Sequence, residues 1–164
     1  MSYFLVLALL FASCFAHVEI TPPKLVPSQN VYDELKTISN VVVVEFYSEY
    51  CGSCKEFAEE WTKLIENKYF HKRIQWAKVN IDTPIGMAIA QAEGALDGGI
   101  PHVRMLDTVN HHVVLMTGNQ MRTAEEIEHA IRNKLKYYPT AAAMGPWIKA
   151  GHSLPGVAHR EFEL

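Results

Sequence analysis

Cysteine is scarce in this chain, and its distribution restricts the covalent chemistry that the chain can carry out. The 164 residues include three cysteines, Cys14, Cys51 and Cys54. Cys14 lies in an apolar N-terminal stretch, whereas Cys51 and Cys54 are separated by two residues. A disulfide that closes so small a loop constrains the unfolded chain little, so a structural role is not favoured for this pair. The spacing indicates a chemical role instead.

Basic runs, glycosylation signals and long internal apolar segments are also missing. The net charge is −3, and Lys and Arg are interspersed with Asp and Glu, so nucleic acid is not an expected partner. No Asn-x-Ser/Thr sequon occurs, so we expect no N-glycosylation. After the N-terminal stretch, no segment has the ~20 apolar residues that span a bilayer, so we expect a soluble processed chain without a membrane span.

The composition is that of a globular protein. Apolar residues make up 49% of the chain and charged residues 20%, which is unlike a disordered sequence. A length of 164 residues accommodates one domain with appendages at its ends. We therefore expect one domain over residues 17–137, followed by an irregular tail over 138–164 that lies over the domain through Trp147 and Phe162.

The N-terminal stretch differs in kind from the rest of the chain. Tyr3 to Phe15 is almost purely apolar, and the small residue Ala16 follows. This pattern predicts a signal peptide over residues 1–16, although no Lys or Arg precedes the apolar run. A membrane anchor is the alternative, but the run is too short to cross a bilayer. Cleavage would remove Cys14 and leave Cys51 and Cys54 as a redox couple in an oxidising compartment.

Hydrophobic periodicity predicts an α/β fold. The run from Val41 to Tyr47 is continuously apolar apart from Glu45, which indicates a strand buried on both faces. Asn30 is expected to cap the first helix, and Thr123 with Glu126 matches a capping box. Strands that alternate with helices, followed by a hairpin, predict a central mixed sheet flanked by helices. Helices are expected near 30–39, 54–69, 86–92 and 124–135, and strands near 24–26, 41–47, 74–80, 103–106 and 113–116.

The dithiol lies where the buried strand leads into a helix. Unsatisfied N–H groups at a helix N-terminus stabilise a thiolate, so Cys51 is the expected nucleophile. Cys54, one turn later, is expected to resolve the mixed disulfide. An inert pair and half of a zinc site are the alternatives. His111 and His112 are adjacent on an expected hairpin, so their side chains point in different directions, which disfavours zinc.

Four separated segments carry a family resemblance. They are Glu45-Phe46-Tyr47, Cys51-Gly52-Ser53-Cys54-Lys55, Ala77-Lys78-Val79-Asn80 and Ile100-Pro101. In this order they closely resemble a catalytic domain of the protein disulfide isomerase family, over residues 24–137. The resemblance implies a thioredoxin fold and thiol–disulfide exchange, with the Cys51–Cys54 disulfide as the redox group and no other cofactor or metal.

The resemblance also implies roles for residues outside the dithiol. Glu45, with Lys78 as its partner, would accept and return the proton of Cys54, and burial would raise its pKa. Pro101 would follow a cis peptide bond, and Arg122 would swing towards the second cysteine. Each has a plainer alternative, namely a solvated strand face for Glu45 and Lys78, an ordinary loop proline, and a solvated arginine before a helix.

The residues expected to meet the substrate are Tyr50, Gly52, Ser53, Ile100 and Pro101. The implied partners are unfolded or misoxidised secretory proteins, with glutathione or an oxidase as the redox partner. The implied activity is that of an oxidoreductase and isomerase. The alternative is a chaperone or escort module whose dithiol only tethers a client.

Two departures from the family pattern bear on the redox strength. Ser53 stands where many relatives have histidine, and Glu49 adds negative charge beside Cys51. Both changes favour a weaker oxidant, so we expect a potential between about −180 mV and about −270 mV.

The chain ends in Glu163-Leu164, a degenerate match to a retrieval signal, so we expect the endoplasmic reticulum lumen, with secretion as the alternative.

Overall fold

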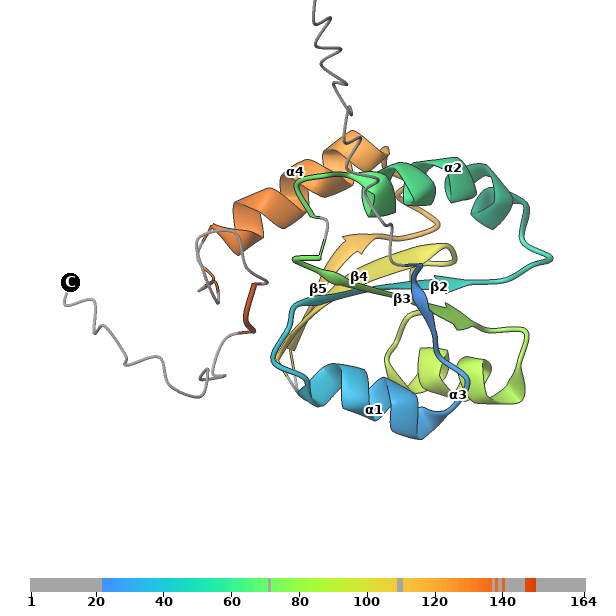
Figure 1. Ribbon diagram of the computed structural model, residues 1–164. Helices are drawn as coiled ribbons and strands as arrows, with labels where there is room; N and C mark the ends of the chain where they lie inside the picture. The colour runs from blue at the N-terminus through green and yellow to red at the C-terminus, as the bar shows by residue number, and fades with distance from the viewer. Residues whose placement is uncertain are drawn as a thin grey trace, which may run out of the picture.

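A five-stranded mixed sheet lies between two pairs of helices (Figure 1). The computed structural model describes residues 22–70, 72–108, 111–136, 138, 140 and 147–149. The helices are α1 (Gln29–Thr37), α2 (Gly52–Glu66), α3 (Pro84–Ala92) and α4 (Ala124–Leu135). The strands are β1 (Lys24–Leu25), β2 (Val42–Tyr47), β3 (Gln75–Asn80), β4 (His102–Thr108) and β5 (His111–Met116). The predicted element order and mixed sheet are confirmed.

Strand β2 occupies the centre of the sheet. The strand order is β1-β3-β2-β4-β5, with β1, β3 and β2 parallel and β4 and β5 antiparallel to their neighbours. Within this register Glu45 pairs with Lys78 on β3 and with Val103 on β4. The central position explains the continuous hydrophobicity of β2, because helices cover both of its faces.

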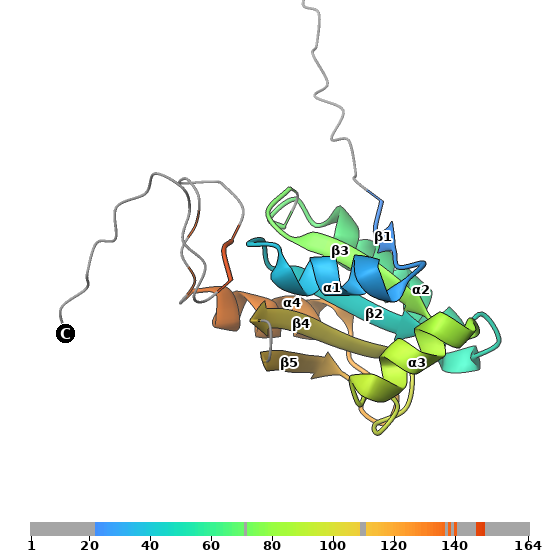
Figure 2. The ribbon, with the colours of Figure 1, turned by 90° about the horizontal axis from the view of Figure 1, so that it is seen from below.

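Alternate residues of β2 face different helices. Val43 belongs to the core cluster that includes Trp61 of α2 and Ile127 of α4. Val42, Val44 and Phe46 belong to a second cluster with residues of α1 and α3. Figure 2 shows α1 and α3 lying across the strands on that second face. Because side chains alternate along a strand, Glu45 points to the α2 face, towards the dithiol.

Polar side chains define where the helices begin. Ser28 caps α1 by accepting a hydrogen bond from the Val31 backbone, so the expectation that Asn30 is the cap was wrong. The earlier start follows because a cap accepts from an N–H two or three residues later, and Ser28 supplies the oxygen at that spacing. The predicted capping box of Thr123 and Glu126 is confirmed at α4.

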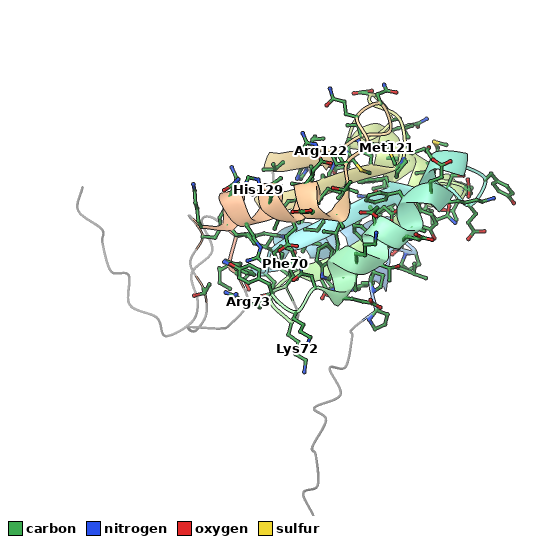
Figure 3. The ribbon with its side chains drawn as sticks, turned by 90° about the horizontal axis from the view of Figure 1, so that it is seen from above. Phe70, Lys72, Arg73, Met121, Arg122 and His129 are labelled. Atoms are coloured by element: carbon green, nitrogen blue, oxygen red, sulfur yellow. The ribbon has the colours of Figure 1, made fainter. Side chains whose placement is uncertain are left out.

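A short segment near the C-terminus packs against the domain. The Val41 backbone donates to the Trp147 carbonyl at 2.9 Å, and Asn40 forms an isolated bridge with Ile148. The guanidinium of Arg73, which lies beside Phe70 in Figure 3, stacks 3.6 Å from the centre of the Trp147 ring. The expectation for Trp147 is therefore confirmed, whereas Phe162 lies outside the described residues.

The segment also closes one end of α1. Lys149 is fully buried, and its Nζ donates to the carbonyls of Leu35 and Lys36 at 2.6 and 3.1 Å. These carbonyls are in the last turn of α1, where the helix leaves acceptors unsatisfied. The expected signal peptide lies outside the described residues. Within the described part, no helix is long and apolar enough to cross a membrane.

Candidate functional site

The dithiol lies where the central strand turns into α2. Cys51 is the N-cap of this helix, and its Sγ accepts a hydrogen bond from the Cys54 backbone at 3.2 Å. Both cysteines are free thiols; Cys51 is partly exposed, whereas Cys54 is only 5% exposed. The first sulfur is accessible to another protein and the second is covered, as attack and resolution require.

The Ile100-Pro101 loop approaches the dithiol. Its peptide bond is cis, which confirms the prediction for Pro101. The Ile100 carbonyl lies 3.8 Å from the Cys51 sulfur and accepts from the Ser53 hydroxyl at 3.2 Å. The Ser53 oxygen also lies 3.1 Å from the Cys51 sulfur. A thiolate at Cys51 would accept from the Cys54 N–H, and it would also accept from the Ser53 hydroxyl when the single proton of that group turns from the Ile100 carbonyl to the sulfur.

The environments of the two thiols push their pKa values apart. Burial acts to raise the pKa of Cys51, but hydrogen bonds with Cys54 and Ser53 outweigh it and hold this pKa below its ordinary value. Burial, together with the hydrogen bond to Cys51, raises the pKa of Cys54 to about 12. Cys51 is thus the thiol that ionises first, and Cys54 needs a base before it can attack.

A buried carboxylate lies on the same face of the sheet as Cys54. Glu45 is 1% exposed, and the Lys78 Nζ lies 3.0 Å from its Oε2. Burial raises the pKa of Glu45, while the Lys78 charge opposes this shift. The Glu45 charge in turn acts to raise the pKa of Cys54. The alternative of a solvated strand face is therefore wrong for Glu45.

Lys78 is the more accessible partner of this ion pair. Its side chain is 20% exposed, and its ammonium lies 4.2 Å from the centre of the Tyr47 ring. Cation–π contact with the ring and the ion pair together hold the ammonium beside Glu45. The structure therefore brings Glu45 and Lys78 together as the family resemblance implied, with two strand residues between Glu45 and the turn that carries the dithiol.

Other predicted residues lie around the dithiol or apart from it. Tyr50 is 86% exposed beside Cys51, and a Cβ at Gly52 would meet nothing within 4 Å, so both present an open surface. The Arg122 Nη1 donates to the Leu115 carbonyl at 2.8 Å, which ties it to β5 and not to a cysteine. Figure 3 shows Arg122 next to Met121, in the loop before α4.

Gly118 is a site residue that sequence reasoning did not identify. A Cβ at this position would lie 2.5 Å from the Ile100 carbonyl oxygen, so the backbone there must lack a side chain. The Gly118 N–H also donates to the Gly99 carbonyl at 3.0 Å. The loop before α4 is thereby fixed against the proline loop. A glycine shortly after β5 was visible in the sequence, but the sequence does not show that the Ile100 carbonyl packs against it.

Ser48 and Asp82 were also missed. The Ser48 hydroxyl donates to Asp82 at 2.6 Å, and the Glu49 backbone donates to the other oxygen of the same carboxylate at 2.7 Å. Both residues follow the ends of neighbouring parallel strands, β2 and β3. Parallel strands end at one edge of a sheet, so this proximity could have been inferred from the topology.

A second polar cluster lies on the α1–α3 face. The Glu93 carboxylate pairs with Lys36 at 3.3 Å, with Arg104 at 3.4 Å and with the His112 Nε2 at 2.9 Å. Arg104 also donates to the His102 Nε2 at 3.3 Å. Among the residues that the structure describes, no cluster of His, Cys, Asp and Glu is arranged to hold a metal ion.

Comparison with known proteins identifies the family. The fold is similar to the thioredoxin of Malassezia sympodialis, Mala s 13, with a TM-score of 0.56 at 19% identity over 68% of this chain and 90% of that one. Oxidised thioredoxin from Plasmodium falciparum gives 0.51 at 20% identity, over 69% and 98% respectively. No curated protein sequence matches. The likeness confirms the predicted thioredoxin fold. The thioredoxin family profile matches residues 23–133, so this chain belongs to the thioredoxin family.

Proposed function

We propose that the chain is a thiol–disulfide oxidoreductase and isomerase of the protein disulfide isomerase type, acting on secretory-pathway proteins. One observation carries the proposal. The partly exposed Cys51 sulfur lies at the N-terminus of α2 with its pKa lowered by hydrogen bonds, beside a buried partner thiol. This arrangement supplies an attacking thiolate and a resolving thiol within one turn of helix.

The reaction follows from the two thiols. The Cys51 thiolate attacks one sulfur of a client disulfide, the client S–S bond breaks, and the released client sulfur takes up a proton. A mixed disulfide now joins Cys51 to the client. Cys54 loses its proton and attacks the Cys51 sulfur, which releases the second client thiol. The client is reduced by two electrons and the Cys51–Cys54 pair is oxidised; the reverse sequence oxidises a client.

Glu45 is the base for the second step. Its pKa is raised by burial, so a proton from Cys54 has an acceptor of improved basicity on the same face of the sheet. No hydrogen bond joins Glu45 directly to Cys54 among the described residues. Transfer therefore uses a water molecule between the two groups or a small movement of the Glu45 side chain. Lys78 compensates the negative charge of Glu45 until the carboxylate takes up the proton, and again after the proton has been returned.

The client lies across the surface formed by Tyr50, Gly52, Ser53 and the Ile100-Pro101 loop. The exposed Tyr50 ring offers apolar contact without sequence selectivity, and the backbone of Ile100 offers a carbonyl for an extended client segment. One domain provides one such surface. We therefore propose weak and unselective capture of unfolded or misoxidised proteins.

The compartment and redox partner belong to the same proposal. The apolar N-terminal stretch and the final Glu-Leu support the endoplasmic reticulum lumen, with secretion as the alternative. Glutathione or an oxidase would recycle the dithiol. Because Ser53 provides a neutral hydrogen bond where a histidine would provide charge, equilibration with glutathione should give a potential below about −180 mV.

The decisive experiment compares wild type with Cys51→Ser and Cys54→Ser in insulin reduction and in refolding of scrambled ribonuclease. Cys51→Ser should abolish both activities, because it removes the attacking sulfur. Cys54→Ser should accumulate mixed disulfides with the client that a reductant releases. If a variant that carries both Cys51→Ser and Cys54→Ser were as active as wild type, the proposed enzymatic function would be refuted.

A redox-tethering chaperone or escort is the second candidate. The feature that favours it is Tyr50, whose 86% exposure provides an aromatic contact independent of the thiols. Suppression of client aggregation separates the two functions. A chaperone would protect clients equally well after Cys51→Ser and would lose protection after Tyr50→Ala, whereas the oxidoreductase would depend on Cys51.

A further inference from the structure

The carboxylate of Asp82 holds the turn that carries the dithiol. Its Oδ1 accepts from the Ser48 hydroxyl at 2.6 Å, and its Oδ2 accepts from the Glu49 N–H at 2.7 Å. Both carboxylate oxygens therefore bind the segment between β2 and Cys51. Hydrogen bonds to a charged acceptor are short and about twice as strong as neutral ones. Asp82 follows β3, the strand next to β2, so the turn is held by a residue that is not part of it.

Asp82 is itself held in place. Its N–H donates to the Asn80 side-chain oxygen at 2.8 Å, in the loop that follows β3. The Asn80 amide also lies 3.5 Å from the Glu49 carboxylate. Hydrogen bonds between Ser48 or Glu49 and Asp82 or Asn80 therefore connect the segment after β2 to the end of β3 and the loop that follows it.

Ser48 transmits this constraint to both cysteines. Its hydroxyl accepts from the Tyr50 N–H at 3.0 Å, and its carbonyl accepts from the Cys51 N–H at 3.4 Å. Burial raises the pKa of Cys54, and a hydrogen bond from the Ser48 backbone counteracts part of that rise. Ser48 therefore contacts the backbone or thiol of each cysteine, while its side chain is bound to Asp82.

We propose that Ser48 and Asp82 form a positioning pair that sets the orientation of the Cys51 sulfur, and thereby its reactivity. The inference rests on the proposed function. Ser48 is 8% exposed and Asp82 is exposed, so the pair lies at the edge of the domain and outside the two hydrophobic clusters. Its main effect is on geometry, because the Cys51 sulfur must keep its alignment with the Cys54 N–H for the thiolate to be stabilised.

The test measures Cys51 alone, without a client. The rate of alkylation by iodoacetamide is followed against pH in wild type, Ser48→Ala, Asp82→Ala and the double variant. Ser48→Ala keeps the Asp82 charge and removes the link, so the pH midpoint of alkylation should rise and the rate at pH 7 should fall about threefold or more, since half a pKa unit corresponds to that change. Asp33→Asn, at an aspartate on α1 whose side chain is half exposed, is the control.

Coupling between the two positions provides the sharper result. If the pair acts as one unit, Ser48→Ala should change the rate by about twofold or less in the Asp82→Ala background. Unfolding midpoints in urea should remain close to that of the control variant. An unchanged alkylation profile in Ser48→Ala, or fully additive effects in the double variant, would overturn the positioning role.

Failure of this inference is distinguishable from failure of the proposed function. Wild type that reduces insulin while Ser48→Ala alkylates normally refutes only the positioning pair. Wild type that fails with insulin and ribonuclease refutes the proposed function, and the alkylation profiles still report whether Ser48 and Asp82 orient the sulfur.

Discussion

Two carboxylates on opposite faces of the sheet, the buried Glu45 and the mostly buried Glu93, have pKa values shifted in opposite directions. Glu45 lies on the α2 face, 1% exposed, with one cationic partner, Lys78. Glu93 lies at the end of α3, with its side chain 11% exposed and with Lys36, Arg104 and His112 around it. Burial raises the pKa of Glu45, whereas the hydrogen bond to His112 and the neighbouring cations lower that of Glu93 to about 2.

The difference shows that the number of partners, and not burial alone, decides what a buried carboxylate can do. One partner on a side chain that is itself 20% exposed compensates only part of the desolvation cost, so Glu45 can take up a proton. Three partners hold Glu93 ionised, so it cannot exchange protons near neutral pH. Glu45 is thus suited to proton transfer and Glu93 to joining α3 to α1, β4 and β5.

The largest expected effect is that of Glu93→Gln. Removal of the carboxylate charge leaves Arg104, which is 3% exposed, without its anionic partner. Breaking a buried ion pair in this way costs about 3–5 kcal/mol, which urea unfolding at pH 7 would measure. Glu34→Gln, on an exposed side chain paired with Lys24, is the control and should cost less than about 1 kcal/mol.

The sign of the pH dependence sharpens this prediction. The folded pKa of Glu93 is below the ordinary value of 4.5, so its stabilisation is complete above 4.5 and is lost as the pH falls towards about 2. Wild type and Glu93→Gln should therefore converge in stability over that range. A difference that stays constant from pH 7 to pH 2 would contradict the ionic role of Glu93.

Glu45→Gln should slow catalysis without destabilising the fold. Loss of a general base slows proton transfer about 100-fold, and stopped-flow detection of the resolving step would measure it. Because burial raises the pKa of Glu45, its ionised form destabilises the fold as the pH rises above 4.5, so the variant should be at least as stable as wild type at pH 7. Glu59→Gln, exposed on α2, is the control. If Glu45→Gln lost as much free energy of unfolding as Glu93→Gln, the proposed difference between a proton-transfer role for Glu45 and a structural role for Glu93 would be contradicted.

His102→Thr tests the network around Arg104. Burial, with the Arg104 charge, lowers the pKa of His102 from 6.5 to about 4, so the fold loses stability as the pH falls between these values. Threonine removes the titrating group, so that part of the pH dependence, about 3 kcal/mol, should disappear from urea unfolding curves. His129→Thr, exposed on α4, should keep the slope of wild type.

Lys78→Met is expected to have the smallest effect. Methionine keeps the length of the side chain and removes the charge that counteracts the raised pKa of Glu45. The pKa of Glu45 should rise further, and the pH profile of the resolving step should move upward by about one unit. Lys63→Met, an exposed lysine on α2, should leave the profile in place. A downward shift would show that Lys78 does not act through Glu45.

The local features of the chain were largely predictable from the sequence. The continuous apolar run identified β2, and the capping box identified the start of α4, because both depend on residues close together in the chain. The same applies to Cys51 at the start of α2. Asn30 was taken as a cap because both Asn30 and Ser28 are good caps, and the sequence does not rank them.

The Glu93 cluster could not be predicted in the same way. Lys36, Glu93, Arg104 and His112 lie on four different elements, and the order of strands in the sheet brings them together. Arg104 lies in the strand expected near 103–106, where its neighbours are apolar and nothing indicates a partner for its charge. The contact between Lys149 and the Leu35 carbonyl, 114 residues away, likewise has no signal in either segment.

The sequence by itself determined the dithiol, the strand that leads into it, the helix that follows and the buried carboxylate at Glu45, since each depends on local spacing and hydrophobicity. The tertiary structure alone decided the electrostatics. Whether Glu45 holds a proton, whether Glu93 keeps its charge and how Asp82 holds the Cys51 turn depend on which strands are neighbours. Desolvation and charge pairing act over a few ångströms in space, regardless of separation along the chain.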